Sequence, residues 1–214
     1  LISALRAMLN IHSGIEITLE ANPGTAEAEK FKAYHETGIN RLSIGVQSFN
    51  DAHLKTLGRI HNSDDAINAI ELAKQAGFEN FNIDLMFALP HQTLDEALCD
   101  LETAIKHAPS HISWYQLTIE PNTVFYSRPP EVPTDDESWS IQERGQSFLH
   151  ENDYSQYEIS AYAKDQQVAS HNINYWEFGD YLGIGAGAHG KVTNIAEGKI
   201  ERFARHKLPN RYME

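Results

Sequence analysis

The sequence predicts an α/β fold made of parallel β/α units, with a smaller α+β region toward the C-terminus. Two observations predict this class. Short apolar runs rich in β-branched residues alternate with longer segments whose apolar residues recur at helical spacing. Most of these runs end in polar or turn-forming residues, as parallel strands do where they give way to a loop. Strands and helices that alternate in this way form an open parallel sheet or part of a barrel.

Four strands are predicted in the first part of the chain, which we delimit as residues 1–120. They cover residues 15–20, 41–46, 81–87 and 111–118. The run at 41–46 is typical of a buried parallel strand, because its apolar residues are nearly continuous and it ends on the polar Gln47. Helices are expected between the strands, at residues 25–37, after Asn50, from a Ser63 cap to Gly77, and from Thr93 to Ile105.

The rest of the chain loses this regular alternation. The prolines within residues 121–136 indicate a connection without regular structure. We expect a C-terminal α+β region over residues 137–214 that packs on the first part. It begins with a predicted helix at 137–151 and a predicted strand at 157–162.

Composition and charge limit the classes of function. The chain of 214 residues has 30 acidic and 17 basic residues, a formal charge of −13, which repels nucleic acid and anionic membrane surfaces. Its apolar runs are shorter than the roughly 20 residues that a membrane span needs. Cys99 is the only cysteine, so an internal disulfide and a cluster held by several thiolates are both excluded within these residues. We predict a cytoplasmic protein, and because Leu1 opens directly into a helix-like segment, a piece of a longer chain.

Polar side chains fall at or near the ends of four successive predicted strands. They are Glu20, Gln47, Asp84 and, on the fourth strand, Gln116 or Thr118. Because the carboxyl ends of parallel strands meet at the crevice where ligands bind, we expect these side chains to face one site. Asp84 lies inside the apolar run IDLMF, where a buried carboxylate needs a cation, backbone donors or a ligand hydroxyl. Capping of a neighbouring loop is the alternative role for Asp84.

A second group of candidates forms the pattern HNxxYW. It consists of His171, Asn172, Tyr175 and Trp176, with the histidine and the tyrosine four residues apart. A packed aromatic patch with a hydrogen-bonded histidine would explain a single such residue. Four ring or amide side chains within six residues indicate instead a flat ligand such as a planar macrocycle, which could stack on the rings.

Three glycines near the C-terminus, Gly185, Gly187 and Gly190, fit the pattern GxGxxG of dinucleotide sites. The segment KVTNIAEG that follows does not have the pattern of the amphipathic helix that such a site requires. A close-packed strand of small residues, which lets the backbone approach a neighbouring ligand, is the better interpretation.

Several ordered motifs together resemble one known family. They are LEANPG at residues 19–24, GINRLSIGVQSFND at 38–51, LGRIH at 57–61, NIDLMFALPHQT at 82–93, HISWYQLTIEPNT at 111–123, YEIS at 157–160, HNINYW at 171–176 and YLGIGAGAH at 181–189. This set, which covers nearly the whole chain, resembles radical SAM proteins related to oxygen-independent coproporphyrinogen III oxidase.

The resemblance implies a partial (β/α)6 barrel that binds S-adenosylmethionine (SAM) beside a 4Fe-4S cluster. Glu20, Gln47, Arg59 and Asp84 match the positions that contact SAM in this family, and Thr118 and His189 align less securely with the same pocket. Arg59 also follows a predicted helix, and interaction with the helix dipole would explain it without a ligand. The family's cluster motif, CxxxCxxC, is absent, so the metal ligands are expected outside these residues.

The resemblance leaves two functions from different classes. The first is a haem chaperone, which binds haem and passes it to an acceptor protein, soluble or membrane-associated. The second is an oxidase that decarboxylates coproporphyrinogen III through a 5′-deoxyadenosyl radical. The segments GVQSF, LGRIH and HNxxYW resemble the chaperones of this family more than the oxidase. We therefore expect haem as the cargo, with the HNxxYW residues as its contacts and His171 as the first candidate for an axial ligand.

Overall fold

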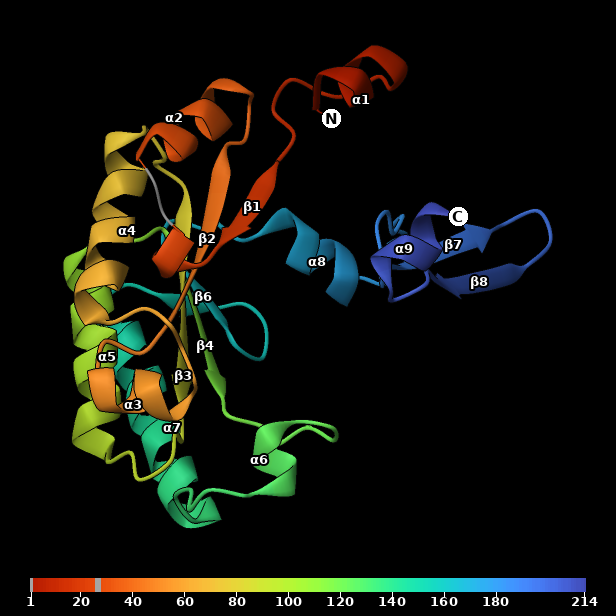
Figure 1. The fold of residues 1–214 in the computed structure, drawn as a ribbon. Helices are drawn as coiled ribbons and strands as arrows, with labels where there is room; N and C mark the ends of the chain where they lie inside the picture. Colours follow the sequence, from red (N-terminus) through yellow and green to blue (C-terminus); the bar gives the residue numbers. More distant parts are fainter. Residues whose placement is uncertain (1, 26–27) are drawn as a thin grey trace. The chain divides into compact units, whose positions relative to one another are not determined.

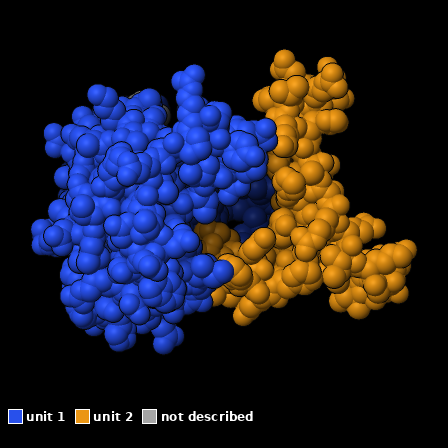
Figure 2. Space-filling model, turned by 90° about the horizontal axis from the view of Figure 1, so that it is seen from below, with its two compact units in different colours: residues 1–168 blue, residues 169–214 orange. Residues whose placement is uncertain are grey.

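The computed structural model describes residues 2–25 and 28–214. They form two compact units that divide between Val168 and Ala169, here called the first unit and the second unit (Figure 2). Within the described residues, no helix combines the length and the hydropathy that crossing a bilayer requires.

A six-stranded sheet forms the centre of the first unit. Its strands, in spatial order, are β1 (Thr18–Ala21), β2 (Arg41–Gln47), β3 (Phe81–Phe87), β4 (His111–Gln116), β6 (Ala161–Ala163) and β5 (Ser155–Gln156). Strands β1 to β4 are parallel, whereas β6 and β5 run antiparallel at one edge. The predicted parallel β/α arrangement is therefore confirmed.

The helices of the first unit lie before and between these strands, and some of them cover one face of the sheet. They are α1 (Ile2–Met8), the 3-10 turn η1 (Pro23–Thr25), α2 (Ala28–Glu36), α3 (Asp51–Thr56), α4 (Ser63–Gln75), α5 (Leu94–Lys106), α6 (Val124–Ser127) and α7 (Asp135–Glu151). Helices α2, α4, α5 and α7 lie side by side over the same face (Figure 1). Capping boxes begin the three longest helices, at Asn62, Thr93 and Thr134, so the cap predicted at Ser63 lies one residue too late.

The covered face of the sheet carries the hydrophobic core. Alternate residues of β2, β3 and β4 point toward the helices and are fully buried: Leu42, Ile44, Val46, Ile83, Leu85, Ile112 and Trp114. Trp114 also contacts α7, where a Cβ atom at Gly145 would lie only 1.9 Å from the indole ring. A glycine at this point of α7 lets the helix approach the sheet closely enough to bury the indole.

Some predicted element boundaries differ in the structure. The proline-rich connection contains α6 and the start of α7. Of the single strand predicted at residues 157–162, only residues 161–162 are extended, within β6. A bend at 158–160 separates β6 from its antiparallel partner β5, which lies before the predicted range. Helix α7 and both strands belong to the first unit.

The second unit is a small α+β unit. It consists of α8 (Ser170–Trp176), the antiparallel strands β7 (His189–Asn194) and β8 (Lys199–Ala204), and α9 (Pro209–Met213). Tyr181 adds an isolated bridge to Lys191 of β7. Lys191 is buried at the centre of this unit, where its ammonium group donates to the backbone oxygen atoms of Phe178 and Gly179 and to the Asp180 carboxylate.

Candidate functional site

The face of the sheet opposite the helices is polar. In the strand register, Glu20 of β1 lies beside Ser43 of β2, Ser43 beside Asn82 of β3, and Asn82 beside His111 of β4. Cross-strand neighbours share one face, so this row of polar side chains crosses four parallel strands. These residues alternate with the apolar ones along each strand, and Ser43, Asn82 and His111 are themselves buried. They form a polar layer on the side where a barrel would enclose its ligand.

Asp84 lies on this polar face and is held by two neighbours. Its carboxylate accepts a hydrogen bond from the Ser43 hydroxyl at 3.0 Å and one from the Asn82 amide at 2.7 Å. Burial raises the pKa of Asp84, and the hydrogen bonds from Asn82, Ser43 and Ser113 oppose that rise. The structure therefore supplies donors for the carboxylate that the sequence placed in an apolar strand.

Asn82 is itself fixed by residues further along the sheet. Its carbonyl oxygen accepts from the Nδ1 atom of His111 at 2.6 Å and from the Ser113 hydroxyl at 3.1 Å. The Nε2 atom of His111 lies 2.7 Å from the Tyr157 hydroxyl. A continuous chain of hydrogen bonds thus runs from Tyr157 to Asp84 and fixes the orientation of that carboxylate.

Gln47 ends β2 in an unusual backbone conformation. Its φ angle is +73°, in the left-handed region that non-glycine residues rarely adopt, and the pairing with β3 shifts register at this point. The side chain is buried, and its amide oxygen accepts a hydrogen bond of 2.6 Å from the Tyr115 hydroxyl. Backbone strain of this kind occurs where a side chain must be presented to a site.

Two buried side chains, Asp100 and His61, bind the backbone on either side of Gln47. The Asp100 carboxylate of α5 accepts from the Ser48 hydroxyl and from the Phe49 backbone amide, both at 2.7 Å. On the other side of Gln47, the His61 ring bonds the Val46 carbonyl oxygen at 3.0 Å. Burial raises the pKa of Asp100 to about 6, although the two hydrogen bonds favour its ionised form.

Tyr115 of β4 donates the hydrogen bond that holds the Gln47 side chain. Its pKa rises to about 12, first because of burial and then because of the negative charge of Asp84; Glu20 acts in the same direction. The positive charge of Arg59 and the hydrogen bond to Gln47 oppose the rise. Of these four residues, Gln47 contacts the phenol directly, through the hydrogen bond of 2.6 Å. Tyr115 is absent from the site residues predicted above, although the alternation in HISWYQ places it on the same face as His111.

The remaining predicted residues do not lie on the strands β1 to β4. Thr118 is exposed in the loop beyond β4, which ends at Gln116. His189 begins β7 in the second unit and is exposed. The HNxxYW residues all lie on α8 of the same unit.

The aromatic residues of α8 expose much of their surface. The Tyr175 and Trp176 side chains are 61% and 51% exposed. Tyr175 packs edge-to-face on Trp176, and its ring centre also lies 6.2 Å from that of Tyr181. This arrangement leaves ring surface available to a flat ligand.

The glycine pattern does not form a dinucleotide site. Gly185 and Gly187 have φ angles of +111° and +77° and shape a turn, but the segment that follows is strand β7 rather than a helix. The close-packed strand of small residues that we predicted for this segment is also not formed, because residues 185–188 make a turn before β7 begins. Gly183 passes so close to the His189 backbone that a Cβ atom would lie 2.0 Å from its carbonyl oxygen.

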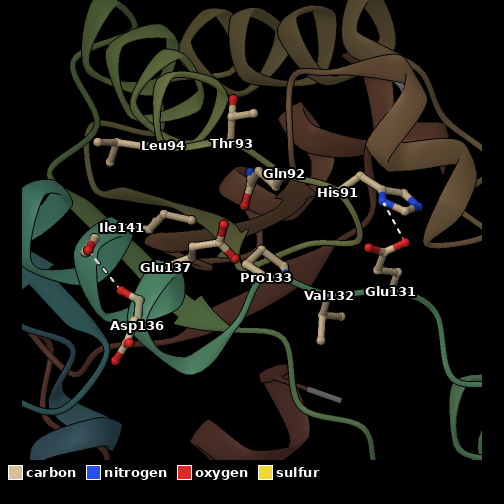
Figure 3. A pocket seen from close by; sticks show the side chains of 11 residues that line it. His91, Gln92, Thr93, Leu94, Glu131, Val132, Pro133, Asp136, Glu137 and Ile141 are labelled. Carbon is tan, nitrogen blue, oxygen red and sulfur yellow. Dashed lines mark hydrogen bonds and ion pairs between the residues drawn. The ribbon is translucent and has the colours of Figure 1, made fainter.

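A separate cavity of about 520 Å³ lies between the first turns of α5 and α7 (Figure 3). Its lining comes from residues 91–94, from residues 131–133 and from α7. None of the predicted site residues contributes to it. Its walls carry the carboxylates of Glu131, Asp136 and Glu137, and the His91 ring lies 3.8 Å from Glu131.

The described residues contain no group of three His, Cys, Asp or Glu side chains that could hold a metal ion. Cys99 is exposed on α5. The side chains of Glu20, Asp84, Gln47 and Arg59 fit the groups of SAM: carboxylates for hydroxyl and amino groups, a buried amide, and a cation for a carboxylate.

Comparisons with known proteins agree with this fold. Residues 1–103 match the Radical SAM superfamily model. Proteins named heme chaperone HemW from Haemophilus influenzae and Escherichia coli K12 are 55% and 53% identical across 100% of this chain, which spans 55% and 56% of their lengths. The solved structure of coproporphyrinogen III oxidase (HemN) from E. coli superposes with a TM-score of 0.78 at 21% identity, over 97% of this chain and 50% of that one. This last likeness establishes the shared fold.

Proposed function

Because this chain belongs to the radical SAM superfamily, we propose that it is part of a cytoplasmic haem chaperone that binds SAM and transfers haem to an acceptor protein. The observation that carries the proposal is its identity of more than half to proteins named heme chaperone HemW, along its whole length. The chain spans about half of those relatives, so the activity concerns the full-length protein.

SAM would bind at the polar face of the sheet. Glu20 and Asp84 would accept hydrogen bonds from its ribose hydroxyl or amino groups, and Gln47 would bridge. Arg59 would hold the SAM carboxylate. What supports this assignment is the strand register, which places Glu20 beside Ser43, and the hydrogen bonds that join Ser43 to Asp84 and Tyr115 to Gln47. A 4Fe-4S cluster beside SAM supplies an electron for radical formation in this superfamily; its ligands would lie outside these residues, and in the chaperone it would have an auxiliary role.

Haem would contact the HNxxYW residues of α8. The exposed faces of Tyr175 and Trp176 suit a planar ring, and Asn172 can donate or accept a hydrogen bond. His171 is the first candidate for an axial ligand, because histidine is a common ligand of haem iron. In the full-length protein, His171→Ala is expected to abolish the shift of the haem absorbance band that binding produces.

One experiment separates the chaperone from the alternative, a coproporphyrinogen III oxidase. The full-length protein is reconstituted with its cluster and assayed for stoichiometric haem uptake and for decarboxylation of coproporphyrinogen III. We expect haem uptake and transfer without decarboxylation. The HemN-like fold motivates the alternative. Repeated turnover of coproporphyrinogen would overturn the chaperone proposal.

The SAM site is tested by two single variants of the full-length protein. Gln47→Ala and Asp84→Ala should each weaken SAM binding by about 1 to 3 kcal/mol, since each removes a buried polar contact. Equilibrium binding of SAM measures the effect. Gln75→Ala, which removes an exposed amide on α4, serves as the control and should leave SAM affinity unchanged. If SAM affinity is unchanged in both Gln47→Ala and Asp84→Ala, these two residues do not bind SAM and have a structural role only.

A further inference from the structure

The end of the second unit has a charge opposite to that of the chain as a whole. Residues 199–211 contain five of the 17 lysines and arginines, Lys199, Arg202, Arg205, Lys207 and Arg211, against the single acidic residue Glu201. The whole chain has a charge of −13. Such a local concentration of positive charge attracts anionic groups that the rest of the surface repels.

A cavity of about 490 Å³ lies within this basic segment. Arg205, His206, Arg211 and Tyr212 line it, together with Ala204 and one acidic residue, Glu214. Among the described residues, no carboxylate forms an ion pair with Arg205 or Arg211. Two guanidinium groups at one cavity, without an ion-pair partner, are suited to bind carboxylates through paired hydrogen bonds.

The glycine turn of residues 183–188 makes hydrogen bonds to three of the residues that line this cavity. The Gly187 amide donates to the His206 carbonyl oxygen at 2.8 Å, and the Arg205 amide donates to Ala188 at 2.7 Å. The Gly185 amide donates to the Tyr212 hydroxyl at 3.1 Å. The GxG pattern therefore holds the arginine-bearing segment in place instead of binding a dinucleotide.

The basic segment belongs to the same unit as the aromatic helix α8. Arg202 of β8 lies over the Phe178 ring at 5.6 Å, just after α8 ends. Tyr175 of α8 packs on Tyr181, which pairs with β7. The second unit thus combines exposed aromatic faces with an arginine cavity, the two features that an apolar planar ring with carboxylates on one edge requires.

We infer that the cavity lined by Arg205 and Arg211 binds the carboxylate side chains of a planar tetrapyrrole whose ring contacts α8. The inference rests on the proposed function, because it assigns the recognition of the haem edge to named residues. It predicts that affinity depends on the two propionate carboxylates as well as on iron ligation and ring contacts.

The test compares haem with haem dimethyl ester, in which both carboxylates are blocked. Each is titrated into the full-length protein, and binding is followed by visible absorbance. We expect the wild type to bind haem about tenfold more tightly than the diester, as a charge-assisted contact with arginine supplies. The double variant Arg205→Gln/Arg211→Gln should bind both compounds equally, with the affinity that the wild type has for the diester.

Two controls make the outcome specific. Lys199→Gln removes a basic residue of the same hairpin that is paired with Glu197, and it should keep the preference for haem. Arg205→Lys/Arg211→Lys keeps the charges and should keep part of that preference. Equal affinity of the wild type for both compounds, or an undiminished preference in the glutamine variant, would overturn the inference while haem binding itself remained. Failure of the wild type to bind either compound would overturn the proposed function as well.

Discussion

The two units of this chain are stabilised in different ways. The first unit buries a continuous cluster of large apolar side chains between its sheet and helices, with Trp114, Leu42 and Ile83 among those that are fully buried. The second unit is organised around a buried cation. Lys191, which is 1% exposed, makes three hydrogen bonds and lies 4.1 Å from the centre of the Phe178 ring.

This difference follows from size and composition. A short segment buries little apolar surface relative to the chain entropy it loses, so it depends on specific polar contacts. Many of the large apolar side chains of the second unit stay exposed, among them Trp176, Leu182, Ile184 and Met213. In the first unit the stability is shared among many buried apolar side chains. In the second unit the contacts of Lys191 carry a larger share of it, so substitution of this residue should destabilise that unit.

The largest effect is expected from truncation of the main core side chain in the first unit. Trp114→Ala should lower the free energy of unfolding of this unit by roughly 3 to 5 kcal/mol, because it leaves a cavity against Phe87 and Tyr162. Denaturant unfolding measures the change. Trp139→Ala removes an indole that is 62% exposed on α7 and should cost little. Similar losses in both variants would contradict a core centred on Trp114.

A smaller effect concerns the buried carboxylate of α5. The pKa of Asp100 is raised from 3.8 to about 6, so the unfolded chain ionises first as pH increases. The contribution of Asp100 to the free energy of unfolding is therefore fully present below about pH 4 and is lost as pH rises through 6, a decrease of roughly 3 kcal/mol at most. Asp100→Asn should remove this decrease. Unfolding at pH 4 and pH 7.5 measures it.

The exposed Asp95 of α5 provides the matched control for this experiment. Asp95→Asn should keep the pH dependence of the wild type. His53 and Glu96 also act on the Asp100 carboxylate, so His53→Gln is included to show whether the pH dependence requires the imidazole. A pH dependence that survives in Asp100→Asn would assign it to another group.

The smallest effect is expected in the second unit. Lys191→Met should lower its stability by about 1 to 3 kcal/mol, because backbone oxygen atoms of residues 178–179 lose their donor. Faster hydrogen exchange of the Thr193 amide, which donates to Asp180, reports the loss. Lys199→Met at the exposed end of the hairpin is the control. If exchange is unchanged in Lys191→Met, the buried lysine does not organise this unit.

The same cluster responds to acid in the opposite direction from Asp100. The hydrogen bond from Lys191, and then those from Thr193, lower the pKa of Asp180 to about 2. Its contribution to stability is thus present above about pH 4 and is lost as pH falls toward 2. Protonation of Asp180 in acid should therefore weaken its contacts with Lys191 and Thr193, whereas protonation of Asp100 stabilises the first unit.

Prediction from the sequence worked best where local pattern decides the structure. The run at 81–87 matches β3 in both bounds, and Thr93 caps α5 as expected. It was less accurate at residues 157–162, where pairing with β4 rather than local preference defines β6. Tyr115 was missed for a similar reason: its partner Gln47 is 68 residues away, and no local pattern indicates that contact.

The sequence by itself determined the alternation of strands and helices, the strand-end carboxylates and amide, and the reversal of charge near the C-terminus, because each is a property of neighbouring residues. The tertiary structure decided which polar side chains meet. The alignment of parallel strands brings Asp84 to Ser43, and the left-handed backbone at Gln47 brings its side-chain amide to Tyr115. Helix α5 brings Asp100 to Ser48, in the loop that follows Gln47. These contacts join residues more than 40 positions apart, and they arise from burial of the opposite, apolar face of the sheet.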